Sequence, residues 1–318
     1  MKPLKLAILD AATLGSDIDL SIFSDFGTAT VYWTTAPSEI VLRLSGVDVC
    51  IINKVKLTKE VLSQAPDLKL ICVTATGYDN VDITYCQTNG IAVCNVAGYS
   101  ANSVSQLTLA MVLSASVHLP TYRQAVADGT YTRGGVQNIL TPVYHELAGK
   151  TWGIIGYGGI GQKVGAAAKA LGCHVIVHKR TPVDGEECVS LEELLSRADI
   201  ITVHLPLTDA TRHLIGEKEL ARMKDGAFLV NVARGAVLDE EAVASAVENG
   251  KLGFFGCDVY STEPMPETHP LYRIRQRENV CLTPHIAWGA YESRERCMKE
   301  IAENIRSYQA NGKRNRIV

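Results

Sequence analysis

Short apolar runs recur along the chain and alternate with helix-forming or turn-forming segments. Between residues 1 and 100 these runs predict strands at Leu6–Leu9, Ala29–Tyr32, Val47–Ile52, Leu68–Val73 and Ile91–Cys94. The intervening segments Pro37–Leu44, Lys59–Ala65 and Asp82–Asn89 have helical or turn character. Strands that are apolar on both faces and are joined by helical crossovers are typical of a parallel sheet with helices on each side.

Residues 151–285 repeat the same alternation. Apolar runs predict strands at Gly153–Ile155, His174–His178, Ile200–His204, Ala227–Asn231, Gly253–Cys257 and Val280–Thr283. Helical patterns lie between them, for example at Gln162–Leu171, Ser190–Arg197 and Asp239–Asn249. The pattern therefore predicts an α/β protein with two doubly wound parallel-sheet domains.

Two further helical segments decide how the domains are connected. Ser103–Asp128 is a long amphipathic segment between the halves, with Leu107, Ala110, Met111 and Ser114 at helical spacing. Ala290–Asn311 predicts a last helix that ends near Gly312. Because no strand follows that helix, the economical placement is back across the first domain. We therefore expect a discontinuous domain of residues 1–100 and 290–318, with residues 101–289 inserted into it.

Composition narrows the possible partners and locations. The net charge of −3 shows no basic excess, which argues against nucleic acid as a partner, and the basic residues at 313–316 are predicted to be a solvated end. No apolar run reaches the length of a membrane span, and residues 1–5 lead into the first strand without a secretory leader. The nine cysteines include no C-x-x-C pair, and Cys50, Cys72, Cys94, Cys257 and Cys281 lie in apolar runs. We expect a cytoplasmic protein without disulfides or bound metal.

A glycine-rich turn follows the first strand of the second half. Residues 156–161 read GYGGIG, directly after the apolar run Thr151–Ile155. In this pattern Gly156 permits the tight turn, Gly158 lets the backbone approach the pyrophosphate of a dinucleotide, and Gly161 lets the helix pack against the strand. The helix N-terminus offers free N–H groups to the anion. A tight turn without a ligand is the alternative, but the strand before the glycines and the Ala-rich helix after them favour a dinucleotide.

Three ionisable residues follow predicted strands of the second half. Arg234 comes after Ala227–Asn231, Glu263 after Gly253–Cys257, and His285 after Val280–Thr283. Ligands of an open parallel sheet bind at the carboxyl ends of its strands, so the three residues are predicted at the edge that carries the glycines. An arginine can hold a 2-oxo acid by its carboxylate, a histidine can protonate the keto oxygen, and a carboxylate can orient that histidine. Taken singly, each also has an ordinary structural role as its alternative.

These motifs resemble the D-isomer-specific 2-hydroxyacid dehydrogenases over essentially the full length of the chain. The resemblance rests on ATGYDNVD (75–82), CNVAGYS (94–100), GYGGIG, HLPLTDATRHLI (204–215), NVARGAVLDE (231–240), DVYSTEP (258–264) and TPHIAW (283–288). It implies a flavodoxin-like substrate domain with an inserted Rossmann domain, the catalytic residues Arg234, Glu263 and His285, and a homodimer formed through an arm at about residues 103–150.

The resemblance also implies the ligand contacts. The substrate is expected at Ala75, Thr76, Gly77, Arg234, His285 and Trp288. The cofactor is expected at Gly156, Tyr157, Gly158, Gly159, Ile160, Gly161, His178, Lys179, Arg180, Thr181, His204, Pro206, Thr211, Val232, Ala233, Arg234, Asp258 and His285. Among these, Asp258 is expected to bind the nicotinamide carboxamide.

The end of the second strand of this half bears on the choice of nicotinamide. An NAD site has an acidic residue about 20 positions past the glycines, on the ribose 2′-hydroxyl. Here residues 178–181 read HKRT, without Asp or Glu. Lys179 and Arg180 would attract a 2′-phosphate and Thr181 could donate to it, which favours NADP(H) over NAD(H). Alternatively, Arg180 stacks on the adenine of NAD.

The resemblance implies an enzyme that reduces a small 2-oxo acid to the D-2-hydroxy acid. The strings LDAATLG (9–15), TTAPSEI (34–40) and HIAW (285–288) are similar to the subgroup that reduces hydroxypyruvate or glyoxylate, the glycerate dehydrogenases. Glu263 disfavours formate dehydrogenase, which has Gln there. A D-lactate or larger-substrate dehydrogenase stays open, because Tyr78 stands where the family often has a smaller residue. A dinucleotide-sensing corepressor of the same fold is the non-catalytic alternative, although the chain leaves little room for the disordered extensions of those proteins.

Overall fold

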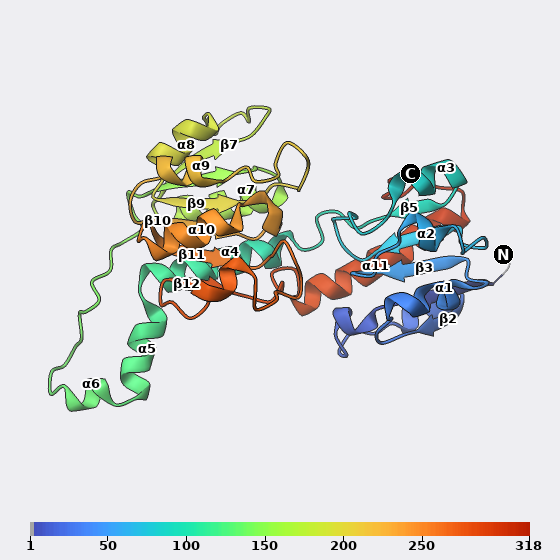
Figure 1. Ribbon diagram of the computed structural model, residues 1–318, viewed down its shortest axis with the longest axis horizontal. Helices are drawn as coiled ribbons and strands as arrows, with labels where there is room; N and C mark the ends of the chain where they lie inside the picture. The colour runs from blue at the N-terminus through green and yellow to red at the C-terminus, as the bar shows by residue number, and fades with distance from the viewer. Residues whose placement is uncertain (1–2) are drawn as a thin grey trace. The chain divides into compact units, whose positions relative to one another are not determined.

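The computed structural model describes residues 3–318 (Figure 1). Residues 1 and 2, part of the segment for which no secretory leader is predicted, lie outside the described residues. The chain divides into two compact units, one made of Met1–Ser100 and Gly289–Val318, the other of Ala101–Trp288.

The first unit is built on a five-stranded parallel sheet in the order β2-β1-β3-β4-β5. Its strands are β1 (Leu4–Ile8), β2 (Gly27–Val31), β3 (Val49–Ile52), β4 (Leu70–Val73) and β5 (Ala92–Cys94). The helices are α1 (Ile40–Leu44), α2 (Lys59–Leu62), α3 (Ile83–Asn89) and α11 (Tyr291–Gln309), with short 3₁₀ turns at Ala11–Leu14, Ser21–Phe26 and Pro37–Glu39. This strand order is that of the flavodoxin-like fold.

The C-terminal helix belongs to the core of this first unit. Cys297, Met298, Ile301 and Ile305 form the buried side of α11, and the helix packs on β4. The chain then returns to the sheet, where Ile317 donates its N–H to the carbonyl oxygen of Val93 at 2.8 Å. The apolar spacing of the helix explains this placement, since its buried residues recur at helical intervals.

The second unit contains a seven-stranded parallel sheet in the order β12-β11-β10-β9-β6-β7-β8. Its strands are β6 (Thr151–Ile155), β7 (His174–His178), β8 (Glu187–Cys188), β9 (Ile200–Val203), β10 (Ala227–Asn231), β11 (Leu252–Cys257) and β12 (Val280–Leu282). Since β6 and β9 are neighbours but are not consecutive, the strand order reverses between them, and this reversal is the switch point at which a Rossmann fold binds its ligand.

Helices cover both faces of this sheet (Figure 1). On one face α4 (Ala101–Ser116) and α7 (Gly159–Ala170) enclose a core that includes Val104, Met111, Trp152 and Val164. On the other, α8 (Leu191–Arg197), α9 (Glu217–Arg222) and α10 (Glu240–Glu248) enclose a second apolar core. Short 3₁₀ turns follow β10 and β11 at Gly235–Val237 and Pro270–Ile274. The predicted fold class, two doubly wound parallel-sheet domains, is confirmed.

The long segment between the halves is not one continuous helix. It breaks after α4, where His118 adopts φ of 50°, and resumes as α5 (Leu119–Ala127) and then α6 (Thr130–Arg133). Pro120 in the first turn of α5 explains the break, because proline is tolerated at a helix start and not in a helix interior. In Figure 1, α5 and α6 extend away from the sheet of their own unit. The part of the chain that the structure describes contains no helix with the length and apolarity needed to cross a membrane.

Candidate active site

The glycine turn joins the ends of three strands of the second unit. Gly156 has φ of 91° and donates its N–H to the carbonyl oxygen of His178, the last residue of β7, at 2.9 Å. A Cβ on Gly156 would lie 2.7 Å from the carbonyl oxygen of His204, which follows β9. A Cβ on Gly161 would lie 2.3 Å from the carbonyl oxygen of Gly156. Two of the three glycines are therefore required by close packing within the protein.

Gly158 and Gly159 meet a different environment. A Cβ on Gly158 would contact no heavy atom within 4 Å, and one on Gly159 only the Cβ of Ala101 at 3.9 Å. Both are exposed, and α7 begins at Gly159 without a side-chain cap. Among the described residues, no side chain therefore caps the first N–H groups of this helix, and such an N-terminus is suited to binding an anion such as a pyrophosphate.

The side chain of His204 is an unsatisfied polar group at the switch point. Both ring nitrogens are buried and neither has a hydrogen-bond partner among the described residues. Burial lowers the pKa of His204 to about 3, so the ring is neutral at physiological pH. A buried polar group without a partner is costly, and such groups are rare in folded proteins. A ligand that hydrogen-bonds to the ring would remove this cost. The unpaired ring of His204 is therefore a second observation, independent of the glycine turn, that fits a bound dinucleotide.

The predicted 2′-phosphate residues lie at the end of β7 and just beyond it. Lys179, Arg180 and Thr181 are exposed, whereas His178 is half-buried and its Nδ1 lies 3.2 Å from the carbonyl oxygen of Val189. The positive charge predicted from the sequence is therefore accessible to a ligand.

The side chain of Tyr157 is buried, which leaves only its backbone near the glycine turn available to a cofactor. Its hydroxyl donates to Glu186 Oε1 at 2.8 Å, and Lys169 Nζ lies 2.7 Å from Glu186 Oε2. Burial and the hydrogen bond to this carboxylate raise the pKa of Tyr157 to about 12. The tyrosine thus anchors the loop that follows Thr181.

Arg234 lies after β10, in a turn held by a buried asparagine. Asn231 Nδ2 donates to the carbonyl oxygen of Arg234 at 2.9 Å, and Ala233 donates its N–H to Asn231 Oδ1 at 3.0 Å. Arg234 itself is half-buried, and its Nη1 donates to the carbonyl oxygen of Ala233 at 2.8 Å. The guanidinium is thereby positioned at the carboxyl end of β10.

Glu263 and His285 form a hydrogen-bonded pair. Glu263 Oε2 lies 2.6 Å from His285 Nδ1, and because a carboxylate only accepts, this ring nitrogen carries a proton. Glu263 Oε1 accepts the N–H of Tyr260 at 3.0 Å. The contact fixes which ring nitrogen faces the carboxylate, and Nε2 is the other nitrogen of the ring. The arrangement is that of a general acid whose tautomer and orientation are set by a carboxylate.

Asp258 holds the loop that carries His285. It is fully buried at the end of β11, and its Oδ1 accepts from Thr283 Oγ1 at 2.6 Å and from the Ile286 N–H at 2.8 Å. Its Oδ2 accepts the Ala287 N–H at 2.8 Å. Burial raises the pKa of Asp258, while these hydrogen bonds oppose the rise. The sequence predicted a cofactor contact here and did not reveal this second role.

The other predicted cofactor and substrate residues of the second unit lie on the same edge of the sheet or near it. The hydroxyl of Thr211 donates to the carbonyl oxygen of Pro206 at 2.7 Å and so shapes the turn after β9. Ile160 is half-buried in the first turn of α7. Val232 and Ala233 are buried after β10, and Trp288 Nε1 donates to the carbonyl oxygen of His285 at 3.1 Å.

The residues predicted to grip the substrate carboxylate belong to the first unit, after β4. Thr76 Oγ1 donates to the carbonyl oxygen of Val96 at 2.9 Å, and Asn95 Nδ2 donates to the carbonyl oxygen of Thr76 at 2.7 Å. Ala75 accepts the N–H of Val96 at 3.0 Å. These bonds fix the backbone at residues 75–77, with Gly77 half-buried and Tyr78 exposed.

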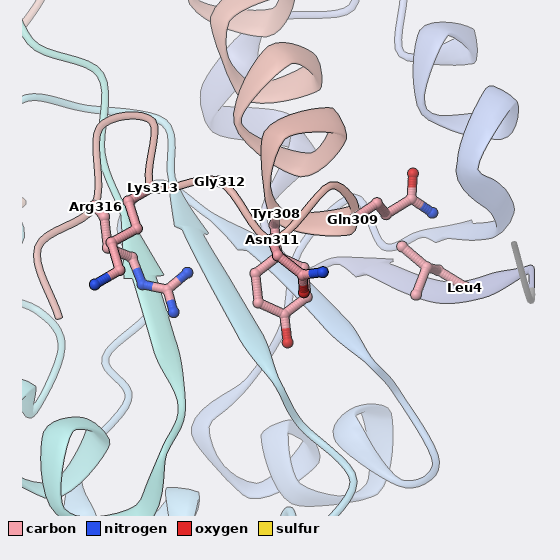
Figure 2. A pocket seen from close by; sticks show the side chains of 7 residues that line it. All are labelled: Leu4, Tyr308, Gln309, Asn311, Gly312, Lys313 and Arg316. Carbon is pink, nitrogen blue, oxygen red and sulfur yellow. The ribbon is translucent and has the colours of Figure 1, made fainter.

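A hollow in the first unit contains none of the predicted site residues. Figure 2 shows Leu4, Tyr308, Lys313 and Arg316 among the side chains that line it. The Arg316 guanidinium lies 5.5 Å from the centre of the Tyr308 ring, and its Nε donates to the carbonyl oxygen of Val318. The arginine is thus held by structural contacts, and we assign this hollow no part in the candidate site.

Comparison with known proteins identifies the family. Residues 109–287 match the family described as D-isomer specific 2-hydroxyacid dehydrogenase, NAD binding domain. The chain is 34% identical over 312 residues to glycerate dehydrogenase from Methylorubrum extorquens, with 98% of each chain covered. It is 39% identical over 267 residues to glyoxylate reductase from Aeropyrum pernix, covering 80% of this chain and 77% of that one.

Solved structures agree with the sequence relatives. The acyclic imino acid reductase Bsp5, in complex with NADPH and D-Arg, has a TM-score of 0.88 and 30% identity, covering 99% of this chain and 100% of that one. D-lactate dehydrogenase from Aquifex aeolicus, complexed with NAD and lactic acid, has a TM-score of 0.83 and 29% identity, with 96% of each chain covered. The chain therefore belongs to the D-isomer-specific 2-hydroxyacid dehydrogenases, a family of oxidoreductases, and residues 109–287 correspond to its nicotinamide-dinucleotide-binding domain.

Proposed function

We propose that this protein reduces a small 2-oxo acid, hydroxypyruvate or glyoxylate, to the D-2-hydroxy acid, with NADPH as the preferred reductant. The observation that carries the proposal is the 2.6 Å contact between Glu263 Oε2 and His285 Nδ1, because a carboxylate on Nδ1 orients the ring and favours its charged form, the proton donor of the proposal. The relatives named glycerate dehydrogenase, hydroxypyruvate reductase and glyoxylate reductase support the choice of substrate.

Each catalytic residue has one task in this proposal. A nicotinamide held at this site would provide the hydride that reduces the keto carbon. Arg234 pairs with the substrate carboxylate through parallel hydrogen bonds, which fixes the orientation of the keto group. His285 donates the proton from Nε2 to the keto oxygen, and Glu263 stabilises the charged ring through Nδ1. The backbone at Ala75, Thr76 and Gly77 is proposed to hold the same carboxylate.

The preference for NADPH rests on charge at the end of β7. Lys179 and Arg180 are exposed there, Thr181 can donate a hydrogen bond, and residues 178–181 include no carboxylate to receive the ribose 2′-hydroxyl. A 2′-phosphate carries nearly two negative charges, and the side chains of Lys179 and Arg180 would form ion pairs with it. The complex of Bsp5 with NADPH adds support from a structural relative.

We also propose that two copies of the chain associate through residues 119–147. Within the second unit α4 packs against α7, whereas the segment after it exposes Leu119, Val126, Leu140 and Val143, each more than half accessible. Apolar side chains in this number on an extended segment are typical of a protein interface. A particle of twice the 34.4 kDa chain mass, measured by sedimentation, would support this; a monomer would exclude it.

We place the dimer in the cytoplasm, in keeping with seven buried cysteine thiols.

Steady-state kinetics with a panel of 2-oxo acids tests the function. We expect oxidation of NADPH with hydroxypyruvate or glyoxylate to exceed that with pyruvate or phenylpyruvate, and NADPH to exceed NADH in kcat/KM. His285→Ala should lower kcat by about 10² to 10⁴-fold while the variant still binds NADPH. Lys218→Ala, an exposed position on α9, serves as the control.

Two results would contradict the proposal. Turnover of His285→Ala at the wild-type rate would show that another group donates the proton. NADPH binding without turnover of any panel member would favour a dinucleotide-sensing binding protein, the non-catalytic alternative on this fold. Preferential turnover of phenylpyruvate would retain the chemistry and replace the substrate with a larger 2-oxo acid.

A further inference from the structure

A buried polar cluster lies behind the loop that carries Glu263. Glu240, the first residue of α10, and His269 are only 8% and 6% exposed, and His269 Nε2 lies 3.0 Å from Glu240 Oε2. Glu240 Oε1 also accepts the N–H of Ser261 at 2.9 Å, and Glu240 Oε2 accepts from the Ser261 hydroxyl. One carboxylate thus receives hydrogen bonds from the backbone and side chain of Ser261 and from the ring of His269.

The backbone fixes which nitrogen of His269 carries the proton. Nδ1 accepts the N–H of Leu271 at 3.2 Å, so the hydrogen of the neutral ring is on Nε2, the atom that faces Glu240. The edge of this ring also contacts Tyr260, with ring centres 5.9 Å apart. His269 is therefore held as a donor, and Glu240 is held as an acceptor.

The cluster connects directly to the candidate catalytic pair. Ser261 is two residues before Glu263, and the intervening loop is short and exposed. Its neighbour Tyr260 donates its N–H to Glu263 Oε1 at 3.0 Å and its hydroxyl to the carbonyl oxygen of Thr283 at 2.8 Å. The position of Ser261 thus sets where Tyr260 and Glu263 stand relative to the loop of His285.

The segment that begins with Arg234 contacts the same loop twice. A Cβ on Gly235 would lie 2.1 Å from the carbonyl carbon of Tyr260 and 2.2 Å from the backbone nitrogen of Ser261, so the two backbones touch there. Five residues later the same segment presents Glu240 to Ser261. A displacement of Ser261 would therefore change the position of Glu263 relative to Arg234.

Burying a carboxylate costs free energy unless several donors surround it, and a well-packed apolar group is often as stable. The arrangement thus needs a reason other than stability. We propose that Glu240 and His269 are positioning residues that hold Ser261 and thereby keep Glu263 on His285 Nδ1. This inference rests on the proposed function for its catalytic consequence, but its geometric content is independent of turnover.

The test compares Glu240→Gln with Glu241→Gln. Glu241 is the next residue of α10, and its side chain is 62% exposed and paired with Arg273, so it controls for the loss of a charge on this helix. Glu240→Gln turns one acceptor oxygen into a donor that faces Ser261 or His269. We expect kcat to fall about 10 to 100-fold with the Kd for NADPH unchanged, whereas Glu241→Gln keeps the wild-type kcat.

A proton NMR spectrum of the NADPH-bound enzyme gives a readout that does not require turnover. The Nδ1 proton of His285, hydrogen-bonded to Glu263, should give a strongly downfield resonance that disappears in His285→Gln. We expect Glu240→Gln to lose or broaden this resonance and Glu241→Gln to retain it. Ser261→Ala, which removes only the hydroxyl donor, should have a smaller effect in the same direction and replaces Glu240→Gln if that variant does not fold.

The outcomes separate this inference from the proposed function. If the wild-type enzyme turns over no 2-oxo acid, the proposed function fails while the resonance still tests the positioning. If Glu240→Gln, or Ser261→Ala in its place, retains both the resonance and kcat, the positioning role is wrong. A lower melting temperature with an intact resonance would likewise make the cluster a stability element only.

Discussion

Alanine at Gly158 separates the cofactor role of the glycine turn from its folding role. Gly158 precedes α7 with φ of −89°, a conformation that alanine adopts, and a Cβ there would meet no protein atom within 4 Å. Alanine reduces the entropy of the unfolded chain, which stabilises the fold by about 0.4 to 1 kcal/mol. It is a poorer helix N-cap than glycine, which costs about 0.5 to 1 kcal/mol. The two effects offset each other, so we expect stability within about 0.5 kcal/mol of the wild type.

The affinity for the cofactor should respond very differently. The added methyl group would occupy the space that the pyrophosphate needs in order to reach the first N–H groups of α7. Hydrogen bonds from such groups to a charged partner are worth about 1.5 to 3 kcal/mol each. Loss of one of them raises the Kd about 10 to 100-fold, since each 1.4 kcal/mol is tenfold.

Gly161→Ala is the matched variant. Its Cβ would lie 2.3 Å from the carbonyl oxygen of Gly156 and 3.2 Å from Ile154 Cγ2, so the helix must move away from the strand. We expect a loss of stability of about 1 to 3 kcal/mol from overpacking. Fluorescence titration with NADPH and urea unfolding measure the two quantities for both variants. Wild-type affinity for NADPH in Gly158→Ala would refute the proposal that the pyrophosphate binds at Gly158. Equal destabilisation of the two variants would refute the argument that only Gly161 is packed tightly against other protein atoms.

Two further predictions concern charge and pH. Lys179→Asp should lower kcat/KM for NADPH relative to NADH by about tenfold or more, because an acidic residue repels a 2′-phosphate and accepts a hydrogen bond from a 2′-hydroxyl. Equal effects on both cofactors would contradict this prediction, and so would the same shift in the control variant Lys218→Asp. His204 makes the free energy of unfolding fall on acidification: the unfolded chain binds a proton below the ordinary pKa of 6.5, while burial lowers the pKa of folded His204 to about 3. The expected slope is about 1.4 kcal/mol per pH unit between these values, and urea unfolding at several pH values should show a shallower dependence in His204→Leu.

The strands were predictable because their signal is local. The bounds of β7 and β10 agree with the predicted ranges, since both are apolar runs ended by polar residues. β8 was not predicted, because two residues in a polar segment carry no period and pair only through the edge of β7. α9 was also missed: of its residues only Leu220 is buried, which leaves no apolar stripe to detect. The break before α5 had a signal in Pro120, which the apolar spacing obscured.

The candidate catalytic residues were predictable from the sequence, but the residues that hold their loops were not. Arg234, Glu263 and His285 follow strands, and the rule that ligands bind at carboxyl ends of parallel strands, together with the family resemblance, was the basis for proposing them. The residues that hold these loops were not selected. Tyr260 and His269 contact segments distant in sequence, at Thr283 and Glu240, and Asn231 holds its own turn through the backbone of Arg234. No spacing rule indicates such contacts, and only the fold reveals them.

Two buried carboxylates stand behind the two halves of the candidate catalytic pair. Asp258 holds residues 283–287, which carry His285, and Glu240 holds Ser261, two residues before Glu263. Burial raises the pKa of Asp258, so its ionised form opposes folding in spite of three hydrogen bonds. Apolar residues of similar volume are often neutral or stabilising by about 1 to 4 kcal/mol at buried charged positions. A carboxylate, however, binds several N–H groups at defined directions, which an apolar side chain cannot do. We infer that carboxylates hold these two loops because the 2.6 Å contact between Glu263 and His285 requires directional hydrogen bonds in the supporting residues as well as close packing.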